Sequence, residues 1–345
     1  MEEIRSGKMV ELDRFIKAQE NSYQTALSEI RSGQKKSHWM WYIFPQIKGL
    51  GFSPTAEYYG IEGYKEAIAY YANPCLKERL IEISGALLEL QGNDARVVMG
   101  YPDDLKLRSS MTLFSEVAND SDVFDKVLEK FFDGEKDIET LKRLAISVDL
   151  MRRSDAYTIE HILSGRELMY RAASGVYGSY KGWKDGKTAI VCGGGNNGGD
   201  GYALAVILQK EGMKADVFAV SDKLTEDGKY YCSQAQELGV PIHGFEEGMK
   251  LDGYDVIVDC ILGTGFQGEV RGMARDAIAA INASGAYVVS VDINSGINGD
   301  TGRGNPAVYS DLTVSVGYYK QGMFKNDAPS HTRRLVNADI GIVLV

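Results

Sequence analysis

Residues 188–201 read Thr-Ala-Ile-Val-Cys-Gly-Gly-Gly-Asn-Asn-Gly-Gly-Asp-Gly, an apolar run that leads directly into a glycine-rich segment. The run at 188–192 predicts a buried strand, and the apolar residues at 202–211 predict a helix after the glycines. The pattern then repeats along the chain. Further strands are predicted at 215–220, 256–260, 287–293, 312–316 and 340–345, and further helices at 159–163, from Ser164 onward and at 274–282. Strands that alternate with helices predict an α/β fold with a doubly wound, mainly parallel sheet.

The glycine-rich segment favours a ligand over a plain turn. Three of its glycines satisfy the spacing G-x-G-x-x-G, namely Gly193, Gly195 and Gly198. Glycines let the backbone approach a pyrophosphate, and a helix N-terminus attracts its charge. The spacing alone is weak support, but Asn196, Asn197 and Asp200 add donors and acceptors that a plain turn does not need. No Gly-Lys-Ser/Thr follows, which excludes a nucleoside-triphosphate P-loop.

Two more polar loops follow predicted strands, where a parallel sheet places its ligand crevice. Asp259 ends an otherwise apolar strand, and Asp292 ends another and is soon followed by Ser295. Each aspartate alone would be read as a helix cap or a loop brace. Three such loops at successive strand ends make one shared site the better interpretation.

The N-terminal part of the chain has a different hydrophobic pattern. Long apolar patterns of helical period occupy 12–30, 76–90 and 123–132, and no segment alternates with period two. We therefore expect a mainly α-helical domain at 1–145, a linker within 134–150 and the α/β domain at 146–345.

Composition limits the class of protein. The chain has 345 residues, of which 44% are hydrophobic and 25% charged, as in a soluble protein of about two domains. Its start, Met1 to Arg5, is charged and predicts no secretory signal, so a cytoplasmic location is expected. The net charge of -10 gives no general attraction to nucleic acid or anionic membranes. The four scattered cysteines predict reduced thiols.

Residues from about 146 to 345 resemble the NAD(P)H-hydrate epimerase family, the YjeF N-terminal domain. The motifs that carry the resemblance are Asn196–Gly201, Asp259 with Gly263-Thr264-Gly265, Val291-Asp292-Ile293 with Ser295-Gly296, Lys320 and Gly322, Asp339-Ile340-Gly341, and Leu168-Met169. The resemblance implies a Rossmann-like fold, frequent homodimers and a potassium ion. It also implies an isomerase of nicotinamide nucleotide repair that interconverts the R and S forms of hydrated NADH and NADPH.

Site residues are carried over from the resemblance by position. Potassium would contact Asn197, Asp259 and Ser295. The substrate would contact Asn196, Asn197, Gly198, Gly199, Asp200, Gly263, Thr264, Gly265, Phe266, Gln267, Gly268, Glu269 and Asp292. For acid–base catalysis, Asp292 is the first candidate and Asp200 the second, although either could instead hold the ribose.

The sequence departs from the family pattern at Asn294, where the family usually has proline. Asparagine leaves this loop less rigid than proline would, which predicts a less fixed position for Ser295. No dehydratase pattern follows the epimerase pattern, so a separate ATP- or ADP-dependent NAD(P)H-hydrate dehydratase is the expected pathway partner.

Two dense segments stand out in the N-terminal half, at 37–46 and 103–114. Residues from about 9 to 144 resemble a family of small bacterial α-helical proteins of unknown function, sometimes labelled calpastatin-like, and this resemblance brings no activity. The aromatic residues of 37–46 are interpreted as core, and His38 as a hydrogen-bonded structural histidine. Four residues could form an anion pocket, although a solvated, salt-bridged loop is favoured: Lys106, Arg108, Ser109 and Ser110.

Two other functions remain open for the second half. A nicotinamide dehydrogenase would use the glycine spacing, but only Asp222 could supply the acidic residue expected after the second strand. A non-catalytic nucleotide-binding module would keep the fold without turnover.

Overall fold

The structure is a computed structural model that describes residues 12–345, so the predictions for Met1 to Arg5 lie outside the described residues. The described chain separates into two compact units, one ending at Leu144 and the other beginning at Ala145. None of the described helices combines the length and apolar character needed to cross a bilayer. All four cysteines are free, as predicted.

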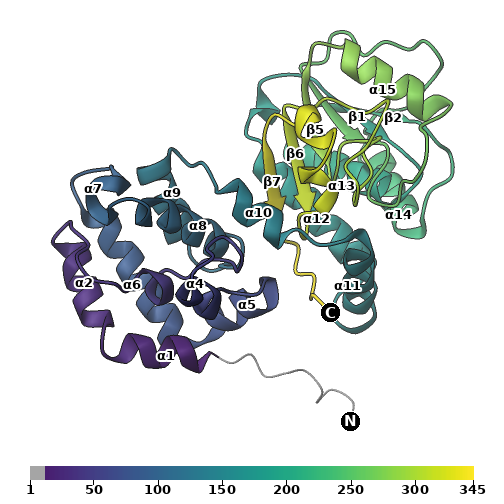
Figure 1. Cartoon of the computed structure of the whole chain (residues 1–345). Coiled ribbons are helices and arrows are strands. Elements are labelled where there is room, and N and C mark those ends of the chain that lie inside the picture. Colours follow the sequence, from purple (N-terminus) through teal and green to yellow (C-terminus); the bar gives the residue numbers. More distant parts are fainter. Residues whose placement is uncertain (1–11) are drawn as a thin grey trace. The chain divides into compact units, whose positions relative to one another are not determined.

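The N-terminal unit is built from helices (Figure 1). These are α1 (Asp13–Glu20), α2 (Tyr23–Arg31), α3 (Met40–Ile43), α4 (Pro54–Tyr59), α5 (Tyr64–Ala72), α6 (Pro74–Glu89), α7 (Ala95–Met99), α8 (Asp103–Ser115), α9 (Val123–Phe132) and α10 (Ile138–Leu144). Its core contains a chain of aromatic contacts. Phe15 meets Tyr70 with ring centroids 5.0 Å apart, and Tyr70 meets Phe114 at 5.1 Å. Helices from distant parts of the unit therefore share one apolar centre.

The C-terminal unit is a seven-stranded, all-parallel sheet in the order β3-β2-β1-β4-β5-β6-β7. Its strands are β1 (Thr188–Cys192), β2 (Ala215–Ala219), β3 (Ile242–Gly244), β4 (Val256–Cys260), β5 (Tyr287–Val291), β6 (Leu312–Val316) and β7 (Leu335–Ala338). Its helices are α11 (Val148–His161), α12 (Gly165–Ser179), α13 (Asn196–Lys210), α14 (Glu226–Glu237), α15 (Met273–Ala283) and α16 (Ala328–His331), with 3-10 turns at Gly182–Lys184 and Gln321–Phe324. The predicted doubly wound fold is confirmed.

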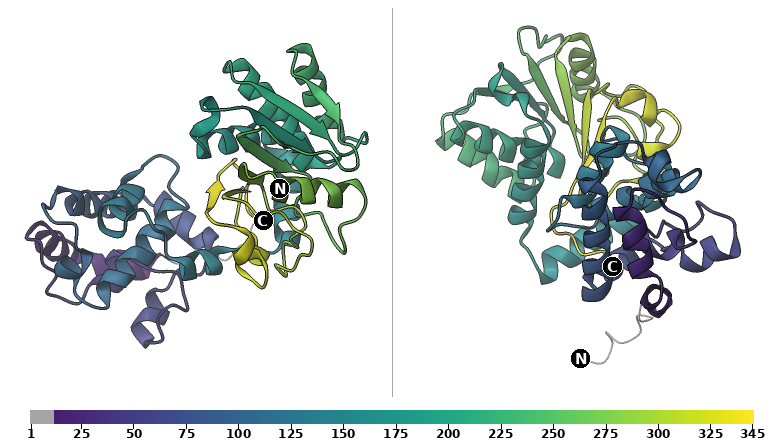
Figure 2. Two further views of the ribbon diagram at one scale, coloured as in Figure 1. Left: turned by 90° about the horizontal axis from the view of Figure 1, so that it is seen from above. Right: turned by 90° about the vertical axis from the view of Figure 1, so that its left-hand side faces the viewer.

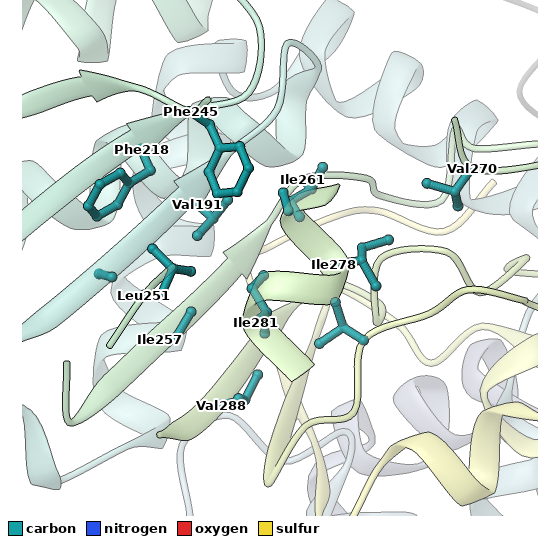
Figure 3. Close-up of a cluster of buried hydrophobic side chains, with 13 residues drawn as sticks. Val191, Phe218, Phe245, Leu251, Ile257, Ile261, Val270, Ile278, Ile281 and Val288 are labelled. Atoms are coloured by element: carbon teal, nitrogen blue, oxygen red, sulfur yellow. The ribbon is translucent and has the colours of Figure 1, made fainter. Parts of the chain in front are cut away.

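Helices cover both faces of the sheet (Figures 1 and 2). On one face, Ile278 and Ile281 of α15 pack against strand residues such as Ile257 and Val191 (Figure 3). On the other face, α13 lies so close that a Cβ on Gly201 would stand 2.6 Å from the Cys192 sulfur. The strands are buried on both sides, which explains their continuous apolar runs.

Three element predictions need correction. The helix expected at 202–211 begins at Asn196, so the polar segment 196–200 forms its first turn. The strand expected at 287–293 ends at Val291, because Asp292 adopts a left-handed φ of 68°. The expected linker 134–150 contains α10 and the start of α11.

The C-terminal tail is a further correction. Among the described residues, 340–345 form no strand, and the last strand is β7. The tail lies along α11 instead, where the Val343 N–H donates to the Thr158 hydroxyl at 3.0 Å and the Val345 N–H to the Ser154 hydroxyl at 3.3 Å. These helix side chains take up hydrogen bonds that a strand neighbour would otherwise provide.

Candidate functional site

The three polar loops predicted from the sequence follow β1, β4 and β5, which are neighbours in the sheet. They border a cavity of about 500 Å³, a size typical of sites for small molecules and cofactors. Its walls come from α11, α12, the start of α13, the loop 261–266, Asp292 and Lys320.

The first turn of α13 faces this cavity. The N-cap residue is Gly195, so no capping side chain accepts a hydrogen bond from the N–H groups of the first turn. The unpaired backbone N–H groups at such an end attract anions. Two glycines make the close turn possible: a Cβ on Gly193 would lie 1.9 Å from the Ile261 oxygen, and one on Gly198 would lie 1.9 Å from the Gly193 oxygen. These glycines are therefore needed for backbone packing at the edge of the site.

Asp259 and Ser295 form a fully buried hydrogen-bonded pair, and neither residue lines the cavity. One carboxylate oxygen of Asp259 accepts from the Ser295 N–H and the Ser290 hydroxyl, both at 2.9 Å. The other accepts from the Ser295 hydroxyl at 2.5 Å. Burial raises the pKa of Asp259, and these hydrogen bonds oppose the shift without cancelling it. The pair therefore ties the loop after β4 to the loop after β5.

Asn197 is the side chain that fits a bound cation best. It is 6% exposed, and neither its amide oxygen nor its amide nitrogen has a hydrogen-bond partner among the described residues. A buried amide without partners is costly unless a ligand satisfies it. With Asp259 and Ser295 it offers amide, carboxylate and hydroxyl oxygens, a donor set that suits a hard cation and so fits potassium. Within 12–345 no group of three or more His, Cys, Asp and Glu side chains could hold a metal ion.

Asn294 is anchored, so the prediction of a less rigid loop is wrong. Its side-chain nitrogen donates to the Val308 oxygen, the Ser310 hydroxyl and the His331 oxygen at 2.9–3.0 Å. Its side-chain oxygen accepts from the hydroxyls of Thr313 and Thr332 at 2.7 and 2.9 Å. Asn294 is 2% exposed, and this buried network fixes the backbone next to Ser295.

Asp292 is committed to an ion pair. One of its carboxylate oxygens meets the ammonium of Lys320, which is 1% exposed and also donates to the Val316 oxygen at 2.8 Å. The other oxygen accepts from the Thr264 N–H at 3.4 Å. Asp292 has a left-handed backbone conformation, and both it and Lys320 line the cavity. Backbone outliers of this kind are frequent at functional sites.

The structure brings most, but not all, of the predicted substrate residues to the cavity. The lining residues among them are Asn196, Asn197, Asp200, Gly263, Thr264, Gly265, Phe266 and Asp292. Gly198 and Gly199 are buried behind the lining. Gln267, Gly268 and Glu269 are exposed outside it, and Glu269 pairs with Arg271 at 2.9 Å.

Sequence reasoning missed Asp155, which lines the cavity from α11. Burial raises its pKa to about 6, the Lys320 charge lowers it and the Asp292 charge raises it. The sequence contains a signal for this residue, since Asp155 lies four residues after Met151 and one after Ser154. This spacing places it on the buried side of the helix. An acidic residue in that position needs a reason.

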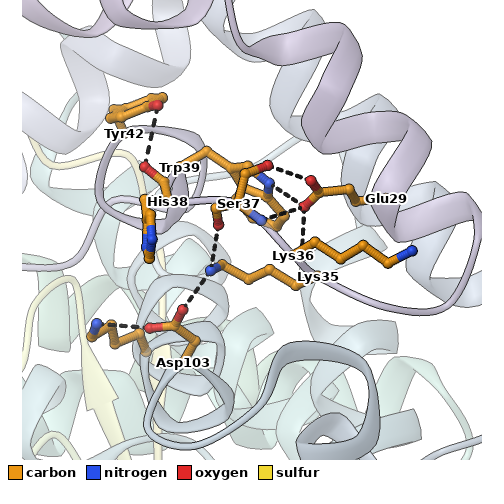
Figure 4. A network of polar contacts seen from close by, with 9 residues as sticks. Glu29, Lys35, Lys36, Ser37, His38, Trp39, Tyr42 and Asp103 are labelled. Atoms are coloured by element: carbon orange, nitrogen blue, oxygen red, sulfur yellow. Dashed lines mark hydrogen bonds and ion pairs between the residues drawn. The ribbon is translucent and has the colours of Figure 1, made fainter.

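The N-terminal unit holds a separate polar network around Glu29 (Figure 4). Its carboxylate accepts from the N–H groups of Lys36 and Ser37, from the Ser37 hydroxyl and from the Trp39 indole at 2.8 Å. Burial raises the pKa of Glu29, but these bonds outweigh it and lower the pKa to about 2. Trp39 is buried, which confirms it as core, whereas His38 is exposed and its ring makes no hydrogen bond within 12–345, so its prediction as a structural histidine is wrong.

The four residues considered as an anion pocket belong to helix α8, not to a loop. Lys106 pairs with Asp103 at 2.7 Å, and Arg108 pairs with Glu135 at 3.0 Å. Ser109 donates to the Asp137 carboxylate at 3.0 Å. The basic groups are thus already neutralised by acidic neighbours, which leaves little positive charge for an anion.

Comparison with known proteins divides the chain into the same two units, each of which matches a different family. Residues 165–322 match the family described as YjeF-related protein N-terminus. The NAD(P)H-hydrate epimerase of Limosilactobacillus reuteri is 33% identical over 208 residues, which cover 58% of this chain and 97% of the relative. The chain belongs to the NAD(P)H-hydrate epimerase family. The bifunctional NAD(P)H-hydrate repair enzyme Nnr of Coxiella burnetii is 34% identical over 197 residues, or 56% of this chain, and the chain spans only 40% of that enzyme's length.

The N-terminal unit matches another family. Residues 9–144 match a family described as a protein of unknown function, DUF1810, which confirms the resemblance to an uncharacterised family. A conserved hypothetical protein of Mycobacterium tuberculosis has a solved structure that is 41% identical, covering 41% of this chain and 100% of that one, with a TM-score of 0.40. The solved structure of the yeast protein ynu0 is 25% identical in sequence to this chain. The match covers 56% of this chain and 86% of the yeast chain, with a TM-score of 0.47.

Proposed function

We propose that residues 145–345 form an NAD(P)H-hydrate epimerase that interconverts the R and S forms of hydrated NADH and NADPH. One observation carries the proposal: the unpartnered, buried Asn197 stands at the α13 N-terminus, beside a cavity bordered by the loops after β1, β4 and β5. A dinucleotide offers a pyrophosphate for that helix end, and the cavity has room for its hydrated ring.

The reaction requires inversion at C6 of the nicotinamide ring. Loss of the C6 hydroxyl as water, assisted by the ring nitrogen lone pair, leaves a transient cationic ring, and water then adds from the opposite face. The protein must supply a proton to the departing hydroxyl and negative charge near the ring. Asp292 is a poor proton donor here, because its carboxylate is paired with the buried Lys320. Burial raises the pKa of Asp200 well above its ordinary value, which favours its protonated form and makes it the better candidate donor.

Asn197, Asp259 and Ser295 would hold potassium. The ion would supply positive charge that offsets the Asp259 carboxylate and fixes the loops. The chain itself would bind the substrate through the N–H groups of the α13 first turn and through Asp292 and Lys320, which also line the cavity. A homodimer, a cytoplasmic location and a separate NAD(P)H-hydrate dehydratase in the same pathway belong to this proposal.

A non-catalytic nucleotide-binding module is the second candidate. The Asp292–Lys320 pair and the uncommitted carboxyl of Asp200 favour catalysis over binding alone. A dehydrogenase is disfavoured, because Asp222 is exposed and does not line the cavity.

The test separates the R and S forms by chromatography after incubation of pure R-NADHX with the protein and potassium, at a mildly alkaline pH where spontaneous inversion is slow. We expect the S form to appear at a rate proportional to protein concentration. The Asn197→Leu variant, which keeps the side-chain size but removes the oxygen, should lose this acceleration. Spontaneous rates with the wild-type protein would support the binding module instead.

A further inference from the structure

Within residues 12–345, two carboxyl groups that line the cavity form no interaction that stabilises the fold. Asp155 projects from α11 and Asp200 from α13, and both line the same cavity (both helices are labelled in Figure 1). Among the described residues, neither side chain has a hydrogen-bond or ion-pair partner. Of the other two carboxyls in the lining, Asp292 pairs with Lys320, and Asp227 pairs with Arg166 at 3.4 Å. Half-buried acidic groups without partners are costly, so their presence in a cavity indicates a role toward a ligand.

Asp155 and Asp200 are both partly exposed, but burial shifts their pKa values to different extents. It raises the pKa of Asp155 to about 6 and raises that of Asp200 well above its ordinary value. At neutral pH Asp155 is therefore mostly ionised, whereas burial favours the protonated form of Asp200. The other charged groups that line the cavity are Arg152 on α11, Asp227 on α14, Asp292 and Lys320. Two carboxyls in one cavity whose surroundings shift their pKa values to different extents are suited to opposite proton-transfer roles.

We propose that Asp155 is the general base of the epimerase, the group that accepts a proton from the water that adds to C6. The proposal rests on the proposed function. Its geometric support is that Asp155 reaches the cavity from α11, whereas the predicted acid, Asp200, reaches it from α13. Inversion needs one group that protonates the departing hydroxyl and another that accepts a proton from the incoming water. Each of the two helices can supply one of these groups.

The proton balance closes without any redox step. Asp200 gives its proton to the C6 hydroxyl, the C6–O bond breaks, and its electron pair leaves with the water. The ring nitrogen lone pair forms a double bond to C6. A new water then bonds to C6, the electrons return to nitrogen, and the extra proton of this water passes to the Asp155 carboxylate. Asp155 ends protonated and Asp200 ionised, which is the state required for the reverse reaction, and proton exchange with solvent restores the first state.

The pH dependence follows from the direction of the shift. Asp155 acts as a base only when ionised, so the rate of R-to-S inversion should fall as the pH drops through about 6. Removal of the carboxyl should remove both the rate and this dependence.

The experiment compares wild type, Asp155→Asn and Asp155→Glu with the control Asp149→Asn. Asp149 lies on the same helix with its side chain 81% exposed and pairs with Arg153. Rates of R-to-S inversion, corrected for the spontaneous rate, are measured across about pH 5 to 9. We expect Asp155→Asn to lose at least about 100-fold in kcat with little change in KM, and to lose the decline near pH 6. Asp155→Glu should keep part of the rate and an acidic limb, and Asp149→Asn should match wild type.

Three outcomes have distinct meanings. An active wild type with an equally active Asp155→Asn variant that keeps the acidic limb overturns the role of Asp155. A fall in rate for Asp155→Asn together with an equal loss of thermal stability, and no recovery in Asp155→Glu, also overturns it in favour of a structural role. A wild type that gives only the spontaneous rate overturns the proposed function itself, before the variants are compared.

Discussion

At the scale of single residues, Asn294 shows how one side chain can replace a rigid backbone. Its amide uses both donors and its oxygen to connect the loop after β5 with Ser310, Thr313, His331 and Thr332. Proline would fix the backbone through its ring, whereas Asn294 fixes it through tertiary hydrogen bonds. The position of Ser295, and with it the predicted cation site, therefore depends on a buried polar network.

We predict that Asn294→Ala lowers the free energy of unfolding of the C-terminal unit by about 3 kcal/mol, because several buried donors and acceptors lose their partner. Differential scanning calorimetry of the whole chain would measure it. Ser310→Ala, which removes only the hydroxyl that bonds to the amide nitrogen, should cost less. Equal stabilities for wild type and Asn294→Ala would show that water replaces the network.

At the scale of elements, the start of α13 depends on close backbone approach. A Cβ on Gly198 would collide with the Gly193 oxygen, whereas a Cβ on Gly195 meets nothing within 4 Å. We predict that Gly198→Ala lowers the free energy of unfolding by more than about 3 kcal/mol, and that Gly195→Ala costs only about 1 kcal/mol as an N-cap change. Calorimetry of both variants would check the difference. Similar losses would mean that the turn relaxes and that the three-glycine spacing has no packing role.

The same element shows what sequence can and cannot predict. The strands β1, β4 and β6 were predicted with their observed bounds, because strands buried on both faces are continuous apolar runs. The start of α13 was placed too late, because Asn, Gly and Asp are weak helix formers and only tertiary packing makes them helical. Local pattern determines an element's type better than its ends.

Site residues follow a comparable rule. The three loops could be predicted, because a parallel sheet brings successive strand ends together. The helical pattern could have placed Asp155 on the buried side of its helix, but only the structure shows that this side faces the cavity. The anchoring of Asn294 depends on partners 14 to 38 residues away, a separation that no local pattern encodes.

At the scale of the whole molecule, the C-terminal unit begins at Ala145, before the family match begins at residue 165. Ile146 pairs with the Lys320 segment: its N–H donates to the Tyr319 oxygen at 2.9 Å, and its oxygen accepts from Gln321 at 3.0 Å. Helix α11 then supplies Asp155 to the cavity and holds the C-terminal tail through Ser154 and Thr158. Ile146, Ser154, Asp155 and Thr158 all lie outside the matched residues 165–322.

We therefore predict that a fragment of residues 145–345 folds and keeps the inversion rate of the whole chain, whereas a fragment of residues 165–345 does not. The longer fragment retains the Ile146 pairing and α11, while the shorter one lacks Asp155 and the Ser154 and Thr158 hydroxyls that hold the C-terminal tail. Calorimetric transitions and R-to-S inversion rates of both fragments would be compared with those of the full chain. An inactive but folded 145–345 fragment would show that catalysis requires the helical unit. An active 165–345 fragment would show that α11 is dispensable, and would count against the role of Asp155 as well.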